Sequence, residues 1–214
     1  MNKGEQTRQA VLEQATVIAA RLGLAGLTIG TLASSAGLSK SGLYAHFGSK
    51  EELQLATLGH AREVFIDRVL RPALAAPRGE PRLRELFGRW LATGRDLPAG
   101  CLYMSSKPEF DDQPGRVRDQ LVRDYRDLLD SIGQMVRAGI DEGQFRPDAD
   151  PAQFAQELDG IVMGFFFAYR MLGDPAIESR ARRAFETALA GLRTGSEQPT
   201  PAGAGRTDRQ PVGS

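Results

Sequence analysis

The sequence of 214 residues predicts an all-α protein, in which a three-helix helix-turn-helix unit precedes a larger helical domain. Apolar residues recur at three- and four-residue spacing through most of the chain, which is typical of amphipathic helices. Ser and Thr before these runs and Gly after them mark where individual helices begin and end. No segment alternates apolar and polar residues for long, and β-branched residues are sparse, so we expect no sheet.

The first fifty residues predict three helices. Apolar spacing indicates the first over residues 7–22. Two shorter helices follow, one between Thr28 and Gly37 and the next between Ser39 and Gly48, because Ser and Thr favour helix starts and Gly tolerates the backbone of helix ends. The residues expected on the inward side of these two helices are Leu32, Ala36, Leu38 and Leu43.

Residues 49–52 read Ser-Lys-Glu-Glu, the pattern of a capping box in which Ser49 and Glu52 each accept a hydrogen bond from a backbone amide of the other. This box opens a long helix that runs towards Pro72, and residues 76–81 form a loop. The same apolar spacing predicts further helices over 83–91, 101–106, 113–138, 154–172 and 176–192.

The predicted helices and the composition divide the chain into three parts. Residues 1–50 form the helix-turn-helix domain, and residues 51–193 form a second helical domain. Residues 194–214 are rich in Gly, Pro, Ser and Thr and contain too few apolar side chains to pack, so we expect a disordered tail.

Charge is unevenly distributed, although Lys+Arg and Asp+Glu both total 27. Residues 1–50 carry five basic and two acidic side chains, a net +3, which permits a polyanionic partner at this end. Residues 51–193 carry 20 basic and 23 acidic side chains, a net −3.

The single cysteine excludes an internal disulfide and a cysteine-rich zinc site. No segment approaches the ~20 apolar residues of a membrane span, so we expect a cytoplasmic protein without a membrane partner. We also expect no metal and no cofactor.

The second helix of the helix-turn-helix pair carries the candidate base-reading residues. In such a unit this helix enters the DNA major groove. Lys40 can reach the O6 or N7 atom of guanine, and Ser41 can bond to several bases. Gly42 costs roughly 0.5–1 kcal/mol of helix stability relative to Ala, but it leaves room for a base edge.

Other polar residues suit the phosphate backbone. Tyr44, His46 and Lys50 lie further along the chain and can meet phosphate oxygens, which position a protein without reading sequence. Thr28 can do the same with its hydroxyl and amide at the start of the preceding helix, and Ser39 begins the reading helix itself. Helix-turn-helix spacing alone leaves open a helical protein-interaction module that does not bind DNA.

Residues 27–53 read LTIGTLASSAGLSKSGLYAHFGSKEEL, and with the helix over 7–22 they closely resemble the N-terminal domain of the TetR family of bacterial transcription regulators. The resemblance covers residues 6–58. It implies a homodimer whose two units dock into successive major grooves of a near-palindromic operator. It also implies that Lys40, Ser41 and Gly42 face bases. It favours repression over activation, although a transcriptional activator of the same family stays open.

The second domain, by the same resemblance, holds an effector pocket and a dimer interface. Residues 160–172 are apolar on nearly all faces and must be covered on several sides, so we expect residues 154–192 to form the dimer seam. A small apolar or aromatic effector would suit a pocket of Met and aromatic side chains. The candidate pocket residues are Trp90, Met104, Phe110, Tyr125, Met163, Phe166 and Tyr169.

Catalysis is not expected. The chain has two histidines and one cysteine, and it lacks a phosphate-binding Gly loop and a nucleophile elbow. Cys101 is expected to be buried and inert, and His60 to lie on the surface. Glu109 is expected to be solvated or bridging rather than a ligand contact.

Overall fold

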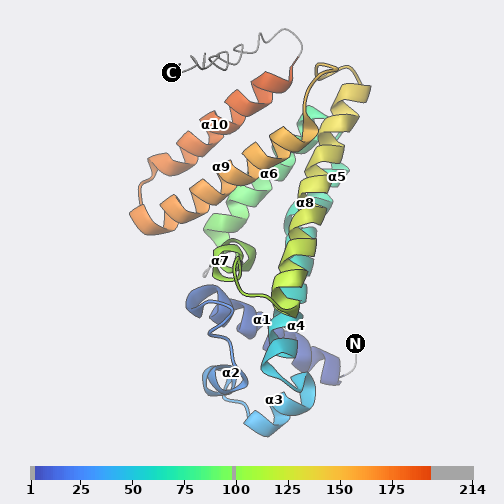
Figure 1. Ribbon diagram of the computed structural model, residues 1–214. Helices are drawn as coiled ribbons and strands as arrows, with labels where there is room; N and C mark the ends of the chain where they lie inside the picture. Colours follow the sequence, from blue (N-terminus) through green and yellow to red (C-terminus); the bar gives the residue numbers. More distant parts are fainter. Residues whose placement is uncertain (1–2, 98–99, 194–214) are drawn as a thin grey trace, which may run out of the picture.

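The computed structural model describes residues 3–97 and 100–193, and the described residues form an elongated stack of helices without a strand (Figure 1). The predicted tail lies outside the described residues. The helices are α1 (Lys3–Leu22), α2 (Ile29–Ala36), α3 (Lys40–Phe47), α4 (Lys50–Phe65), the π-turn η1 (Ile66–Leu70), α5 (Arg71–Ala75), α6 (Glu80–Asp96), α7 (Leu102–Glu109), α8 (Arg116–Asp141), α9 (Pro151–Leu172) and α10 (Ala176–Leu192).

Helices α1, α2 and α3 form one end of the molecule (Figure 1). α2 and α3 begin and end at the residues that their sequence predicts. The Thr28 side chain caps α2 by accepting a hydrogen bond from the Thr31 amide, and Gly37 ends α2 with a left-handed backbone of φ 64°. Ser39 caps α3 through the Gly42 amide, and Gly48 ends it.

Two details of this end differ from the prediction. Leu38 is 39% exposed instead of facing inward, because it follows the turn at Gly37 and precedes the helix. The capping box at α4 is only half formed. Ser49 accepts a hydrogen bond from the Glu52 amide, but the Ser49 amide donates to the Phe47 carbonyl and Glu52 pairs with Arg116. A full capping box forms instead at α2, between Thr28 and Thr31.

α4, η1 and α5 form one continuous rod that joins the two ends of the molecule. The rod loosens into a π-turn over η1, an arrangement that the apolar spacing does not reveal and that is frequent at functional sites. His60 on α4 is buried rather than on the surface, because α1 packs over it and Gln9 Nε2 lies 3.3 Å from His60 Nδ1.

Helices α6, α8, α9 and α10 enclose the larger core (Figure 1). Trp90 and Leu158 are completely buried there, and the Phe87 and Phe185 rings stack with centroids 4.1 Å apart, which joins α6 to α10. The helix bounds differ modestly from those predicted. α6 begins at Glu80 inside the expected loop, and α7 continues to Glu109 although Pro108 in its last turn has no amide hydrogen to donate.

A smaller core joins the helix-turn-helix unit to the base of the second region. Its members from the first 58 residues include Val11, Leu12, Ala15, Leu24, Leu32, Leu43, Phe47, Leu53 and Leu58. Leu102 of α7, Phe110 directly after α7, and Val117 and Leu121 of α8 complete it. The helix-turn-helix unit therefore rests on α7 and α8 through buried contacts, while the boundary drawn at residue 50 stays a prediction.

Candidate nucleic-acid interface and ligand cavity

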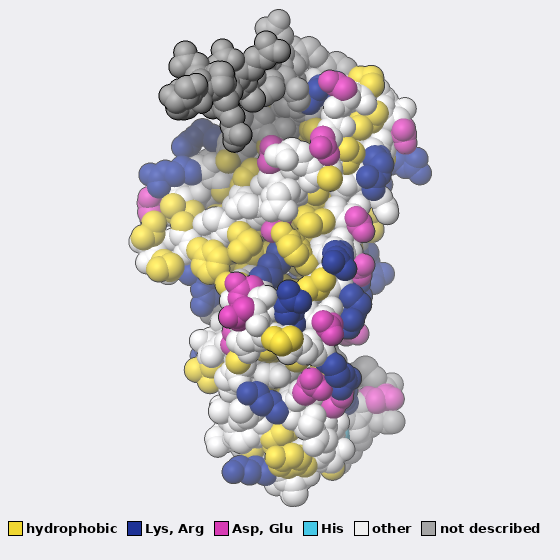
Figure 2. Space-filling view, viewed as in Figure 1, with side chains coloured by type: hydrophobic (Ala, Val, Ile, Leu, Met, Phe, Trp, Pro, Cys, Tyr) yellow, Lys and Arg dark blue, Asp and Glu magenta, His cyan; other side chains and the backbone are white. Residues whose placement is uncertain are grey.

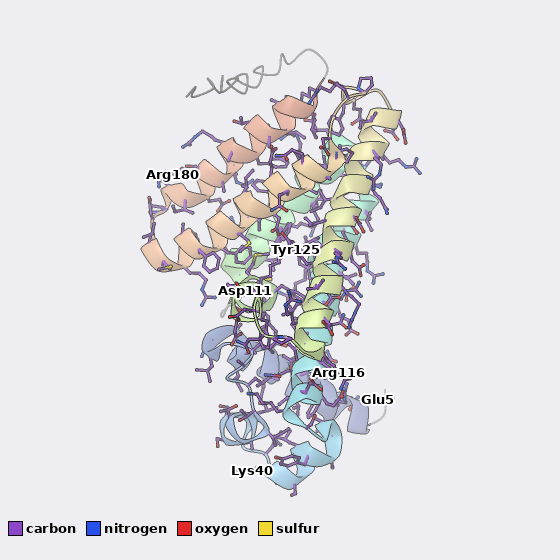
Figure 3. The ribbon with its side chains drawn as sticks, viewed as in Figure 1. Glu5, Lys40, Asp111, Arg116, Tyr125 and Arg180 are labelled. Carbon is purple, nitrogen blue, oxygen red and sulfur yellow. The ribbon has the colours of Figure 1, made fainter. Side chains whose placement is uncertain are left out.

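The outward face of α3 is open to solvent at the tip of the molecule, where Figure 3 labels Lys40. Two buried side chains, Leu43 and Phe47, hold the helix against the small core. Their spacing leaves the opposite face exposed, and this face presents Lys40, Ser41, Gly42, Tyr44 and His46. Tyr44 is 54% exposed, so its ring and hydroxyl are accessible to a partner.

The start of α3 is capped by hydrogen bonds to the Ser39 side chain. Ser39 Oγ accepts hydrogen bonds from the Gly42 amide at 3.1 Å and from Ser41 Oγ at 3.4 Å. A Cβ at Gly42 would lie 3.0 Å from Ser39 Oγ, so the glycine also accommodates the cap. Gly42 therefore has room for this cap as well as the predicted space for a base edge.

Thr28 is more engaged than its sequence context indicates. Its Oγ1 accepts a hydrogen bond from the Thr31 amide at 3.0 Å, and its own amide donates to Thr31 Oγ1 at 2.9 Å. The Thr28 hydroxyl can still donate its hydrogen to a phosphate while its oxygen accepts from the Thr31 amide, whereas the Thr28 amide would have to give up its bond to Thr31 Oγ1. The Lys40 side chain passes beside Gly30, since a Cβ there would lie 3.9 Å from Lys40 Cε. The starts of α2 and α3 thus lie side by side.

The start of α4 adds a second cluster near α3. Lys50 is exposed at the first position of α4, directly after the Ser49 cap. The two carboxylates that follow, Glu51 and Glu52, both pair with Arg116 at the start of α8, at 3.1 and 2.5 Å (Figure 3). Arg116 therefore offsets negative charge that would otherwise repel phosphate beside Lys50.

Glu109 fastens the helix-turn-helix unit to α7. Its two carboxylate oxygens accept hydrogen bonds from the Leu24 amide at 2.7 Å and from the Ala25 amide at 2.8 Å, in the turn after α1. Gln54 of α4 donates to the Leu24 carbonyl at 2.7 Å from the other side. Glu109 therefore bridges two parts of the chain, as expected.

A cavity of about 80 Å³ lies between the α4–η1 rod and helices α6, α7 and α8. Its lining includes Arg62, Phe65, Ile66, Leu70, Trp90, Cys101, Tyr103, Met104, Lys107, Asp124, Tyr125 and Leu128. Of the predicted pocket residues, Trp90, Met104 and Tyr125 line it. Cys101 is half-buried there, and burial raises the pKa of its thiol.

The other predicted pocket residues lie elsewhere. Phe110 and Met163, again with Tyr125, line a more open hollow of about 380 Å³ beside α7 and α8. Phe166 and Tyr169 are not among the lining residues of either space. Phe166 instead packs against Gly94 of α6, and Tyr169 stacks on Phe165 with ring centroids 5.2 Å apart.

Two buried carboxylates organise the polar side of the cavity. Asp124 accepts hydrogen bonds from Tyr103 Oη at 2.6 Å and from Gln120 Nε2 at 3.0 Å, and it pairs with Arg62 of α4 at 3.0 Å. Burial and the Asp124 carboxylate raise the pKa of Tyr103. The network therefore keeps this phenol protonated while it ties α7 and α8 to the rod.

The second carboxylate is Asp159 of α9, which is 1% exposed. It pairs with Lys107 at 2.8 Å and accepts a hydrogen bond from Tyr125 Oη at 2.7 Å. The Lys107 ammonium also lies 3.7 Å from the centre of the Tyr125 ring. Burial and Asp159 raise the pKa of Tyr125 to about 12.

Sequence reasoning missed both networks, although it had a signal for them. Asp124 lies on the apolar side of its helix, between Leu121 and Leu128, and Asp159 interrupts a nearly continuous apolar run. A carboxylate in such a position is buried only when it is paired. The identity of its partner depends on how the helices pack and cannot be derived from spacing.

The exposed helix α3 lies at one end of the molecule and a cavity lies within its helical body, an arrangement that fits a ligand-controlled regulator. Residues 11–57 match the family model of bacterial regulatory proteins of the tetR family, and residues 79–185, half of the chain, match that of the tetracyclin repressor-like C-terminal domain. The chain therefore belongs to the tetR family of transcriptional regulators, which are not enzymes.

Individual relatives agree with this family. The HTH-type transcriptional repressor KstR2 of Mycobacterium tuberculosis is 28% identical over 146 residues, 67% of this chain and 71% of KstR2. A TetR transcriptional regulator from Chloroflexus aurantiacus has a similar structure, with a TM-score of 0.78 and 26% identity over 89% of this chain and 96% of that one. AibR, crystallised with isovaleryl coenzyme A and operator DNA, shares the fold at a TM-score of 0.69 and 21% identity, over 83% of this chain and 95% of AibR.

The described helices include none that is both long and apolar enough to cross a bilayer.

Proposed function

We propose that this regulator is a homodimeric repressor that binds a near-palindromic operator and leaves it when a small apolar or aromatic effector occupies the cavity. The observation that carries the proposal is the exposed face of α3, which presents Lys40, Ser41, Gly42, Tyr44 and His46 together while Leu43 and Phe47 fix the helix from behind. Such a face suits the major groove, and we expect Lys50 at the start of α4 to meet a phosphate.

Two elements connect the cavity with the reading helix. The α4–η1 rod lines the cavity with Arg62, Phe65 and Ile66, and its other end begins beside α3. α7 lines the cavity with Tyr103 and Met104 and ends at Glu109, which holds the turn after α1. A ligand that binds more tightly to a conformation with displaced α4 or α7 therefore lowers the affinity of the protein for the operator. A ligand with equal affinity for both conformations would leave their populations unchanged.

The relatives support repression and ligand control. KstR2 is named a repressor, and AibR was crystallised with both a coenzyme A thioester and operator DNA. A regulator from Saccharomonospora viridis with the same fold was crystallised with choline, at 23% identity. Because these ligands differ in charge and size, the chemistry of this cavity is the better guide to its effector.

Fluorescence anisotropy tests the proposal on DNA from upstream of the protein's own coding region, beside a scrambled duplex, at two salt concentrations. We expect tight binding to one duplex that falls steeply with salt, because each neutralised phosphate releases counterions. Binding that is weak and equal on both duplexes, repeated across a genome-wide pull-down, would contradict the proposal. A protein-interaction module would instead show little dependence on salt.

Transcription from the bound promoter separates repression from activation. In vitro transcription is measured with and without the protein on the duplex that it binds. A repressor lowers the transcript level, whereas an activator of the same family raises it.

A further inference from the structure

We propose that the cavity between α4, η1, α6, α7 and α8 binds a neutral, largely apolar small molecule whose carbonyl oxygen accepts a hydrogen bond from the Trp90 indole Nε1–H. The inference rests on the proposed function, because it names the chemical class of the effector. It is carried by an unpaired donor, the apolar walls beside it and the pairing of every nearby cation.

The donor is the indole of Trp90. The side chain lines the cavity and is completely buried, and its Nε1 makes no hydrogen bond within the described part of the chain. Buried indole N–H groups usually find a partner, because leaving one unpaired is costly. A ligand oxygen beside Nε1 would supply that partner, and indole can only donate, so the ligand atom must be an acceptor.

The walls around the indole are apolar. Phe65 meets the Trp90 ring edge to face, with centroids 5.4 Å apart, and so fixes the plane of the indole. Leu70, Met104 and Leu128 complete this side of the cavity. A ligand body of hydrocarbon is therefore stabilised both by leaving water and by its contact with these side chains.

The charged side chains of the lining argue against a charged ligand. Arg62 is committed to Asp124 at 3.0 Å and to Asp127 at 2.9 Å. Lys107 is committed to Asp159 at 2.8 Å and to the Tyr125 ring. An anion that drew either cation away would leave a buried carboxylate without its partner, which is strongly unfavourable. A cationic ligand would find both buried carboxylates already neutralised.

The size of the cavity limits the ligand further. Its volume of about 80 Å³ is near half of the ~150 Å³ in which a protein core can hold benzene. A single ring with a carbonyl therefore requires a small outward movement of one wall. Met104 has a flexible side chain, and the π-turn η1 contributes Ile66 and Leu70, so these are the walls that can yield.

Trp90 is the only tryptophan of the chain, so the indole N–H gives one signal in a proton–nitrogen NMR spectrum. Three probes are titrated into the full-length protein: cyclohexanone, its hydrocarbon isostere methylenecyclohexane, and cyclohexanecarboxylate. We expect cyclohexanone to move the indole proton downfield with saturation and to bind roughly 5- to 10-fold more tightly than the hydrocarbon, the value of one net hydrogen bond. Equal affinity for ketone and hydrocarbon, or tighter binding of the carboxylate, would overturn the inference.

Trp90→Phe keeps an aromatic ring and removes the donor. We expect calorimetry to show that this variant binds both neutral probes with similar affinity. Leu128→Ala is the matched control, because it shortens an apolar wall of the cavity but keeps both Trp90 and the Phe65 ring that holds the indole plane, so it should weaken both probes and keep their ratio. If Trp90→Phe does not fold, the comparison of the three probes on the unaltered protein still shows whether the cavity prefers a carbonyl oxygen.

Operator anisotropy, measured on the same samples, separates this inference from the proposed function. Operator binding without a preference for the ketone refutes the chemistry proposed for the cavity and leaves the regulator intact. A preference for the ketone without operator binding confirms the ligand class and refutes the regulator.

Discussion

At the scale of single residues, Lys40 and Tyr44 offer the clearest test of the α3 surface. Both are exposed, so their truncation should leave the free energy of unfolding nearly unchanged. Lys40→Ala should weaken operator binding about 10-fold or more, the range of one base contact, and Tyr44→Phe several-fold, the range of one hydrogen bond. Anisotropy measures both effects. Arg126→Ala, which removes an exposed cation from α8, is the control, and normal affinity in both α3 variants would refute the assigned contacts.

A substitution of Glu109 tests whether α7 holds the helix-turn-helix unit in place. Glu109→Gln keeps the shape but offers only one acceptor oxygen to the Leu24 and Ala25 amides, so one buried amide loses its partner. We expect a loss of about 1–2 kcal/mol in the free energy of unfolding, measured in urea. Asp112→Asn, at an exposed position in the next loop, should change little. Equal stabilities of the two variants would show that the bridge contributes nothing.

Single residues also show the reach of sequence reasoning. Thr28, Ser39 and Gly37 could be assigned to helix ends because capping depends on neighbours within three or four residues. His60 and Leu38 were misplaced, since the packing of α1 covers one and the turn after α2 exposes the other. The hydrogen bonds of Glu109 span 84 and 85 positions, and no local pattern reports them.

At the scale of elements, Gly94 allows the close approach of α6 to α9. A Cβ at this position would lie 2.8 Å from Phe166 Cζ and 3.1 Å from Phe165 Cε1. Gly94→Ala should therefore cost about 1–3 kcal/mol through overpacking and lower the Tm by roughly 2–4 °C per kcal/mol. Gly88→Ala, on the same helix with nothing within 4 Å, should instead stabilise by up to about 1 kcal/mol. Calorimetry of the two variants measures their Tm values. Equal changes in Tm would contradict the close packing of α6 on α9 at Gly94.

The start of α6 and the end of α10 are joined by an ion pair that depends on pH. Hydrogen bonds from Arg193, and then from Arg84, lower the pKa of Glu80 from 4.5 to about 2, despite some burial. Because the folded protein lowers this pKa, the stabilisation is complete above pH 4.5 and disappears as the pH falls through about 2. Glu80→Gln should lose about 1 kcal/mol at pH 7, since the pair is partly exposed.

Urea unfolding at several pH values measures this effect. The difference in unfolding free energy between Glu80→Gln and the unaltered protein should shrink between pH 4.5 and pH 2. Glu85→Gln, which removes an exposed i,i+4 pair with Arg89, is the control and should have a small effect at every pH. A difference for Glu80→Gln that stays constant with pH would contradict the assignment.

The elements themselves divide into those that periodicity predicts and those that it does not. Amphipathic spacing located α8, α9 and α10 because their apolar stripes are long. The π-turn η1 keeps the same residue types as the flanking α-helices, so spacing could not reveal it. A pocket was predicted from the family resemblance and its members from residue type alone, which explains why Trp90, Met104 and Tyr125 line the cavity beside η1 whereas Phe166 and Tyr169 pack elsewhere.

At the scale of the whole molecule, we propose that the exposed side of α9 is the surface that meets a second copy of the chain. Figure 2 shows hydrophobic side chains gathered on the viewed face where α9 runs. Phe167 is 42% and Met171 80% exposed, which is unusual for residues of their size. Gly164 and Gly160 lie one and two turns before Phe167 on the same stripe. A Cβ at either glycine would have nothing within 4 Å, so a partner helix can approach closely there.

Phe167→Glu should therefore convert the dimer into monomers, because it would bury a carboxylate without a partner at the seam. In a dimer, binding of one α3 helix to the operator raises the effective concentration of the other α3 helix at its half-site. The monomer loses this effect and should bind operator DNA at least ~100-fold more weakly. Light scattering after size exclusion gives the mass, and anisotropy gives the affinity. Leu74→Glu, which places the same charge on an exposed apolar residue of α5, should remain dimeric and keep its affinity for DNA. A Phe167→Glu variant that stays dimeric would place the seam on another face.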